Sequence, residues 1–149
     1  MDRFQALLNQ ISPLIDEPLY ADRKRAVRIT INETLHVHLE DDEPKDRILI
    51  ATFISEIPPG RYRENLLKEG LKSNAQFPRV GTFAYSERNN QLCLFEYHSY
   101  VNLTGEKVAD RLAVFIEKAL LWRQAIEGGT LPAGKEVESK ANRSVFGPQ

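Results

Sequence analysis

The stretch that decides the fold runs from Leu35 to Pro59 and reads LHVHLEDDEPKDRILIATFISEIPP. Its first six residues alternate between apolar and polar, which is typical of a β-strand with one buried face. The polar run at residues 41–46 predicts a turn. The apolar run at residues 48–54 predicts a central strand that is covered on both faces. Pro58 then breaks the strand and favours the first turn of a helix.

Upstream of this stretch, the chain predicts one helix and one strand. An apolar stripe at helical spacing predicts a helix over residues 2–12, and Pro13 should end or kink it because proline has no backbone N–H to donate. Residues 27–31 alternate between apolar and polar side chains and predict a half-buried strand. Asn32 and Glu33 form the turn that joins it to the strand beginning at Leu35.

Downstream, the pattern predicts a helix, a hairpin and a long last helix. The second helix should end near Asn74, and the hairpin joins residues 82–86 to residues 91–98. Thr104 is a suitable N-cap for the last helix, which should end before Gly128. Short turns between successive strands favour antiparallel pairing. The predicted fold class is therefore α+β, with the order α-β-β-β-α-β-β-α and a twisted, mainly antiparallel sheet packed by helices.

Composition limits the class of protein. The chain has 149 residues, of which 42% are apolar, so one domain can bury a core without a disulfide or a metal. A net charge of −1 argues against a nucleic-acid binder. Cys93, the only cysteine, lies in an apolar run and is predicted to be buried and inert. Neither a signal peptide nor a membrane span is evident, so we expect the cytoplasm.

Two motifs invite a chemical interpretation. Residues 129–136 fit G-x-x-x-x-G-K but end in Glu and follow a helix, so we interpret the match as chance and expect no nucleotide or other cofactor. His36, His38 and Glu40 share one face of a strand, a pattern that can hold zinc, and His98 could join them if the strands align. A solvated polar face is the interpretation we favour. No nucleophile motif is present, so we predict a protein-binding module with no catalytic or metal-binding residues.

The stretch from Leu35 to Pro59 also resembles the class I type III secretion chaperones, the family of the Tir and YopE chaperones. The matching features are the strand that ends at Glu40–Asp41, the central strand that begins at Asp46–Arg47, and the helix that follows Ile57–Pro58. The segments at residues 63–67 and 74–77 and the last helix, with Trp122 near its end, are similar as well. The resemblance covers about residues 2–127, which we expect to form one domain, with a flexible tail over residues 128–149.

The resemblance implies a function. It implies a cytoplasmic homodimer in a Gram-negative bacterium that acts without ATP. Such a protein binds the extended N-terminal segment of secreted effector proteins and keeps them competent for export, with the secretion ATPase as a further partner. By position, the residues implied for the dimer contact are Tyr62, Leu66, Leu67, Gly70, Leu71 and Phe83. The residues implied for cargo binding are Phe4, Leu8, Ile11, Val27, Ile29 and Leu94.

Two other functions stay open at this point. One is a dimeric regulatory or sensory domain of the same fold that takes no part in secretion. The other is a small metal-dependent enzyme that uses His36, His38 and Glu40. We also expect Gly70 to permit close approach of the second helix at the dimer contact, because glycine has no side chain.

Overall fold

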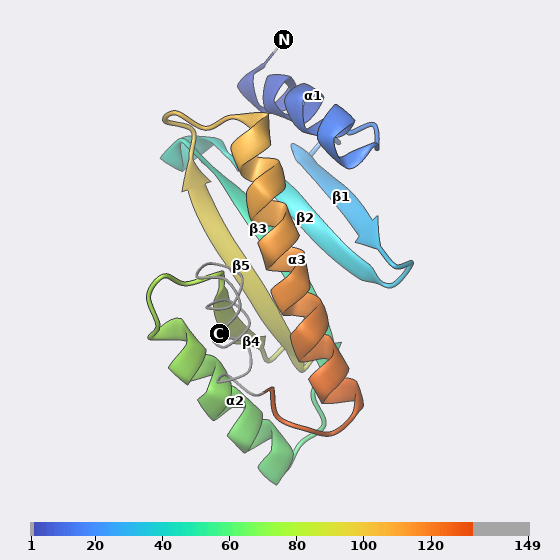
Figure 1. The fold of residues 1–149 in the computed structure, drawn as a ribbon, viewed down its shortest axis with the longest axis vertical. Helices are drawn as coiled ribbons and strands as arrows, with labels where there is room; N and C mark the ends of the chain where they lie inside the picture. Colours follow the sequence, from blue (N-terminus) through green and yellow to red (C-terminus); the bar gives the residue numbers. More distant parts are fainter. Residues whose placement is uncertain (1, 133–149) are drawn as a thin grey trace, which may run out of the picture.

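The computed structural model describes residues 2–132 as three helices and a five-stranded sheet (Figure 1). Their order along the chain is the predicted one. The tail predicted at residues 128–149 falls mainly at residues 133–149, outside the described residues. The elements are α1 (Arg3–Ile15), β1 (Ala26–Ile31), β2 (Leu35–Asp42), a short 3-10 turn η1 (Glu43–Lys45), β3 (Arg47–Glu56), α2 (Arg61–Asn74), β4 (Thr82–Ser86), β5 (Gln91–Ser99) and α3 (Gly105–Glu127).

The sheet is antiparallel throughout, with the strand order β1-β2-β3-β5-β4. β3 therefore lies in the middle, as its apolar sequence predicts, and pairs with β2 on one side and β5 on the other. The register sets Thr52 of β3 beside Val37 of β2 and Leu94 of β5. β1 and β4 are the two edge strands.

The helices pack on one side of the sheet (Figure 1). α3 crosses the sheet, α1 packs against α3, and α2 packs against the edge strand β4. The core between them is apolar. Phe115 is fully buried and Trp122 lies with its ring centroid 4.0 Å from that of Phe83. Thr104 caps α3 as predicted, because its hydroxyl accepts a hydrogen bond from the backbone N–H of Lys107 at 3.2 Å.

The second face of β3 is open, contrary to the prediction that both faces are covered. Ile50 and Thr52 face the helices and are buried, whereas Leu49 and Ala51 on the other face are half-buried and Phe53 is 48% exposed. A run of apolar residues shows that a strand has two apolar faces. It cannot show whether the second face is covered by the same chain or is left for a partner.

Two smaller features also differ from expectation. α1 continues past Pro13 to Ile15 and ends at Asp16, which has φ 55° and donates its N–H to Ser12 O, so proline is accommodated in the last turn. Cys93 is half-buried on the open face and not fully buried. Burial nevertheless raises the pKa of its thiol, which keeps it protonated and weakly reactive near neutral pH.

Gly70 gives a direct test of the packing between α2 and β4. A Cβ built on Gly70 would lie 3.5 Å from Phe83 Cβ, an ordinary van der Waals contact. Because alanine is the better helix former, Gly70→Ala is expected to raise the free energy of unfolding by up to about 1 kcal/mol. Urea unfolding at one fixed protein concentration measures this change.

Gly81→Ala is the matched control. Gly81 has φ +67°, and an added Cβ would lie 2.6 Å from Leu94 Cδ1. This variant should therefore lose stability where Gly70→Ala gains it. A loss of stability in Gly70→Ala would contradict the packing described for α2.

Candidate protein-binding surfaces

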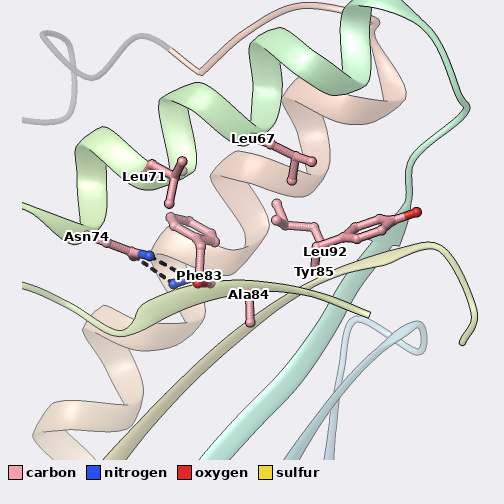
Figure 2. Close-up of a pocket in the computed structure, with 8 residues that line it drawn as sticks. Leu67, Leu71, Asn74, Phe83, Ala84, Tyr85 and Leu92 are labelled. Carbon is pink, nitrogen blue, oxygen red and sulfur yellow. Dashed lines mark hydrogen bonds between the residues drawn. The ribbon is translucent and has the colours of Figure 1, made fainter. Parts of the chain in front are cut away.

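A groove lies between α2 and β4 and forms a pocket of about 200 Å³ (Figure 2). We call it the α2–β4 groove. Its walls are mainly apolar. The side chain of Asn74, the main polar group, donates to Phe83 O at 3.0 Å and accepts from Phe83 N at 2.8 Å, so its hydrogen-bonding capacity is largely used within the chain. The groove therefore suits an apolar side chain. It is lined by Leu67, Gly70, Leu71, Asn74, Phe83, Ala84, Tyr85 and Leu92.

The residues predicted for the dimer contact divide between core and groove. Leu66 and Phe83 are buried within the chain, whereas Leu67 is half-buried and Leu71 is 68% exposed, and both line the groove. Tyr62 is half-buried, and its hydroxyl donates to Thr130 O at 2.7 Å. The dimer contact itself stays a prediction. The structure adds that its accessible part is the side of α2 that carries Leu67 and Leu71.

Gly70 contacts the neighbouring strand of its own chain. It is buried, and the nearest atoms to an added Cβ belong to Phe83 of the same chain. Close approach of a second subunit at Gly70 stays a prediction. Within the chain, the added Cβ would lie 3.5 Å from Phe83 Cβ, an ordinary contact between α2 and β4 that does not itself require glycine. A bulky residue at this position would disturb that contact first, so it would give no clean test of a dimer.

Phe77 was missed by the site prediction, although it is the most exposed of the large apolar side chains in the described residues, at 88%. It lies in the loop that joins α2 to β4, the two elements between which the groove lies. The sequence does contain a sign of this exposure. Phe77 is an aromatic residue between the end of a helix and Pro78, and its segment has no periodic apolar pattern that would predict burial.

The residues predicted to bind cargo are nearly all in the core. Their regular spacing, helical in α1 and alternating in the strands, marks the faces that pack between the sheet and helices α1 and α3. Only Val27 is half-buried, on the edge strand β1. The other five are buried, namely Phe4, Leu8, Ile11, Ile29 and Leu94. Cargo contact stays a prediction, and Val27 is the member of the set that a partner could reach.

The outer edge of β1 has backbone groups that no other strand of residues 2–132 pairs. Arg25 O accepts from Asp41 N on the β2 side at 3.0 Å, whereas Ala26 O accepts from Asp22 N at 2.9 Å. In an antiparallel ladder the direction of these groups alternates along the strand. Arg28 and Thr30 therefore direct their N–H and C=O groups outward, which is the arrangement that accepts an added strand.

The polar side of the open sheet face gives no support to a zinc site. His36, His38 and Glu40 share this face as predicted, and His36 Nδ1 lies 3.1 Å from Thr30 Oγ1. Burial, with help from Arg28, lowers the pKa of His38. Among residues 2–132, no three His, Cys, Asp or Glu side chains are grouped so that they could hold a metal ion.

His98 cannot complete that set, because it lies on the opposite face of the sheet. There it contacts Glu96, which is 9% exposed. Glu96 also accepts from Arg111 Nε at 2.6 Å and from Gly81 N at 2.9 Å. Burial alone would raise the pKa of Glu96, but the hydrogen bonds from His98 and Arg111 outweigh it and hold the pKa below its ordinary value. The cluster joins β5, α3 and the loop that precedes β4.

Comparison with known proteins agrees with this fold. The model of the Tir chaperone protein (CesT) family matches residues 6–123. No curated protein matches the chain. In the part of the chain that is described, no helix has the length and apolar content needed to cross a bilayer.

Solved structures of similar fold include two type III secretion or effector complexes. The HopA1–SchA chaperone–effector complex gives a TM-score of 0.67 at 20% identity, covering 82% of this chain and 94% of that chain. The Yersinia pestis type III secretion chaperone SycH, in complex with a stable fragment of YscM2, gives 0.64 at 19% identity, covering 78% and 97%. YbjN, a putative transcription regulator from E. coli, gives 0.52 at 14% identity, covering 81% and 90%. These matches confirm the predicted α+β fold.

Proposed function

Because the chain belongs to the Tir chaperone (CesT) family, we propose that it is an ATP-independent type III secretion chaperone. It binds the N-terminal segment of one or more secreted effector proteins in extended form and keeps them competent for export. The observation that carries this proposal is the family match over residues 6–123. The HopA1–SchA complex, in which a similar fold is seen with an effector, supports it.

The finer parts of the proposal follow from the same family. We place the protein in the cytoplasm of a Gram-negative bacterium, as a homodimer, with the secretion ATPase as a further partner. The α2–β4 groove supports the dimer, because it leaves apolar side chains of α2 uncovered in the single chain. We propose no enzymatic activity, in keeping with a chaperone family.

We propose that the effector segment adds to the sheet along the outer edge of β1. Backbone groups of Arg28 and Thr30 would pair with the added strand, and Val27, half-buried on the helix side, would contact its apolar side chains. Main-chain hydrogen bonds of this kind provide affinity whatever the sequence of the added strand, and pockets for its side chains provide specificity. This suits a protein that captures a segment before it folds.

Thr30→Pro tests strand addition. Proline removes one outward N–H and leaves the ladder with β2 intact, since an edge strand tolerates it there. We expect effector binding to weaken about tenfold, with stability changed little. Calorimetric titration of an effector segment measures the affinity.

Thr30→Val is the matched control, because it loses the same hydroxyl, and with it the contact to His36, but keeps the backbone N–H. It should bind like the parent. Equal affinity of Thr30→Pro and Thr30→Val would show that the edge of β1 does not take the effector.

A deletion strain tests the function itself. Loss of the gene should abolish secretion of at least one effector while secretion of unrelated substrates continues, and the parent sequence should restore it. The similarity to YbjN favours a second candidate, a regulatory domain of the same fold. In that case the deletion would change transcription and leave effector export intact when effector expression is held constant.

A further inference from the structure

The loop that carries Phe77 is held in place by hydrogen bonds, although the Phe77 side chain is exposed. The backbone N–H of Gln76 donates to Ser73 O at 3.2 Å. Arg79 Nη1 donates to Asn74 O at 2.5 Å, and its guanidinium carbon lies 5.7 Å from the centroid of the Phe77 ring. A loop held in this way loses little further freedom when a partner covers its side chain, which favours binding.

The far side of the loop is fixed to α3. Arg111 Nη2 donates to Arg79 O at 2.7 Å, and Lys118 Nζ donates to Val80 O at 2.6 Å and to Ser73 Oγ at 2.9 Å. Because α3 is the longest helix of the core, these bonds tie the loop to the rigid part of the subunit. The folded chain therefore fixes the backbone of the loop that exposes Phe77 to solvent.

The α2–β4 groove has the size and chemistry to accept an aromatic ring. An apolar cavity of about 150 Å³ is large enough to hold benzene, and this pocket measures about 200 Å³. In Figure 2, Leu67 and Leu71 point from α2 toward Phe83 and Leu92 across the groove.

Phe77 and the groove belong to the same part of the fold, the unit formed by α2, the edge strand β4 and the loop that joins them. α2 supplies one wall of the groove, and Phe77 follows three residues after Asn74, which lines it. In a twofold dimer each surface meets its own copy, so a projecting group and a pocket on one edge can fill each other twice. An antiparallel approach of two α2 helices would also bring exposed Glu64, in the first turn, toward exposed Lys72 near the other end of the partner helix.

We propose that Phe77 of each subunit inserts into the α2–β4 groove of a second copy of this chain. The inference rests on the homodimer of the proposed function. It adds which side chain and which pocket form the contact between the two subunits. Other possible occupants of the groove are an effector side chain and the part of this chain that follows Pro132. The experiments below separate these from a second copy.

Cross-linking tests the contact directly. Phe77→Cys and Leu71→Cys are made separately in a Cys93→Ser background, so that each protein carries one cysteine, and are mixed to exchange subunits before mild oxidation. A disulfide-linked dimer is expected in the mixture and not in either protein alone. Cross-linking of Phe77→Cys alone would place the two loops at the twofold axis and overturn the inference, as would a dimeric mixture that does not cross-link.

Sedimentation equilibrium measures the energetic effect. Phe77→Ser should raise the dimer dissociation constant at least tenfold. Tyr20→Ser is the control, because Tyr20 is another exposed aromatic residue (76% exposed) but is distant in sequence from α2 and β4, and it should leave the dissociation constant unchanged. Deletion of residues 133–149 should leave it unchanged too. If the deletion alters the dimer and Phe77→Ser does not, the inference is wrong.

The result also separates this inference from the proposed function. A chain that is dimeric, binds an effector and is indifferent to Phe77→Ser overturns the inference alone. So does a Phe77→Ser variant that keeps its dimer but loses the effector, since Phe77 would then contact cargo and not a second copy. A parent chain that is monomeric and binds no effector overturns both.

Discussion

Arg111→Met is expected to lower the free energy of unfolding by about 3 kcal/mol at pH 7. Arg111 is the main cationic partner of Glu96, which is 9% exposed, and it also donates to Arg79 O. Without Arg111, the buried carboxylate of Glu96 keeps only His98 and the N–H of Gly81 as partners. Breaking a buried ion pair in this way costs about 3–5 kcal/mol. The lower end applies here, because the Arg111 side chain is 32% exposed and solvent screens part of the charge.

The loss of stability in Arg111→Met should become smaller as the pH falls. Because the pKa of Glu96 is lowered in the folded chain, its contribution to stability is present above the ordinary carboxyl pKa of 4.5 and is lost as the pH falls through the folded pKa. In Arg111→Met, burial is no longer opposed by the guanidinium, so Glu96 takes up its proton at higher pH. The difference in free energy of unfolding between Arg111→Met and the parent should therefore decrease from pH 7 to pH 4.

A second substitution provides the control. Glu96→Gln in the Arg111→Met background removes the buried charge that Arg111 no longer balances and keeps an oxygen that can accept from Gly81 N. The double variant should be more stable than Arg111→Met alone at pH 7. If the two variants unfold at the same urea concentration, Glu96 is not held as a charged group by Arg111.

Leu94→Ala is expected to cost about 3 kcal/mol of stability and to leave the effector affinity of the folded protein unchanged. Leu94 is fully buried in β5, where it pairs with Thr52 and Phe83 and packs over Gly81. Truncating a buried leucine removes apolar burial and leaves a cavity, with a measured range of about 2–5 kcal/mol. Urea unfolding gives the stability, and calorimetric titration below the unfolding transition gives the affinity.

Val27→Ala is the comparison for this second variant. Val27 is half-buried at the sheet edge, so its truncation should cost less stability than Leu94→Ala and should weaken effector binding. The reverse pattern, with a stable Leu94→Ala chain that has lost its effector, would show that Leu94 lines a cargo groove as the sequence comparison implied.

Local sequence patterns predicted the elements because each follows from local physics. The alternation from Leu35 to Glu40 required a strand with one buried face. Thr104, followed by apolar residues at helical spacing from Val108 to Ile126, required a capped helix. The strand order, in contrast, does not follow from local sequence patterns. Alternation shows which residues of β5 face the core, but it does not show that β5 pairs with β3 and leaves β4 at the edge.

The candidate site was less accessible to sequence reasoning, for a physical reason. Apolar residues at a regular spacing mark both a packed core and a groove that awaits a partner, so Leu94 and Leu71 carry the same signal. The first is fully buried and the second is 68% exposed. Phe77 carries no periodic signal, because it lies in a loop. Its role depends on how that loop is tied to α3, which only the folded chain reveals.

Co-purification with effector segments tests the central claim most directly. The chain is co-expressed with the first hundred or so residues of each protein that the source organism secretes, and complexes are isolated through a tag on the chaperone. At least one segment should remain bound through gel filtration and, when measured by hydrogen exchange, should protect the amides of Arg28 and Thr30. A full panel in which no segment stays bound would contradict the function proposed here.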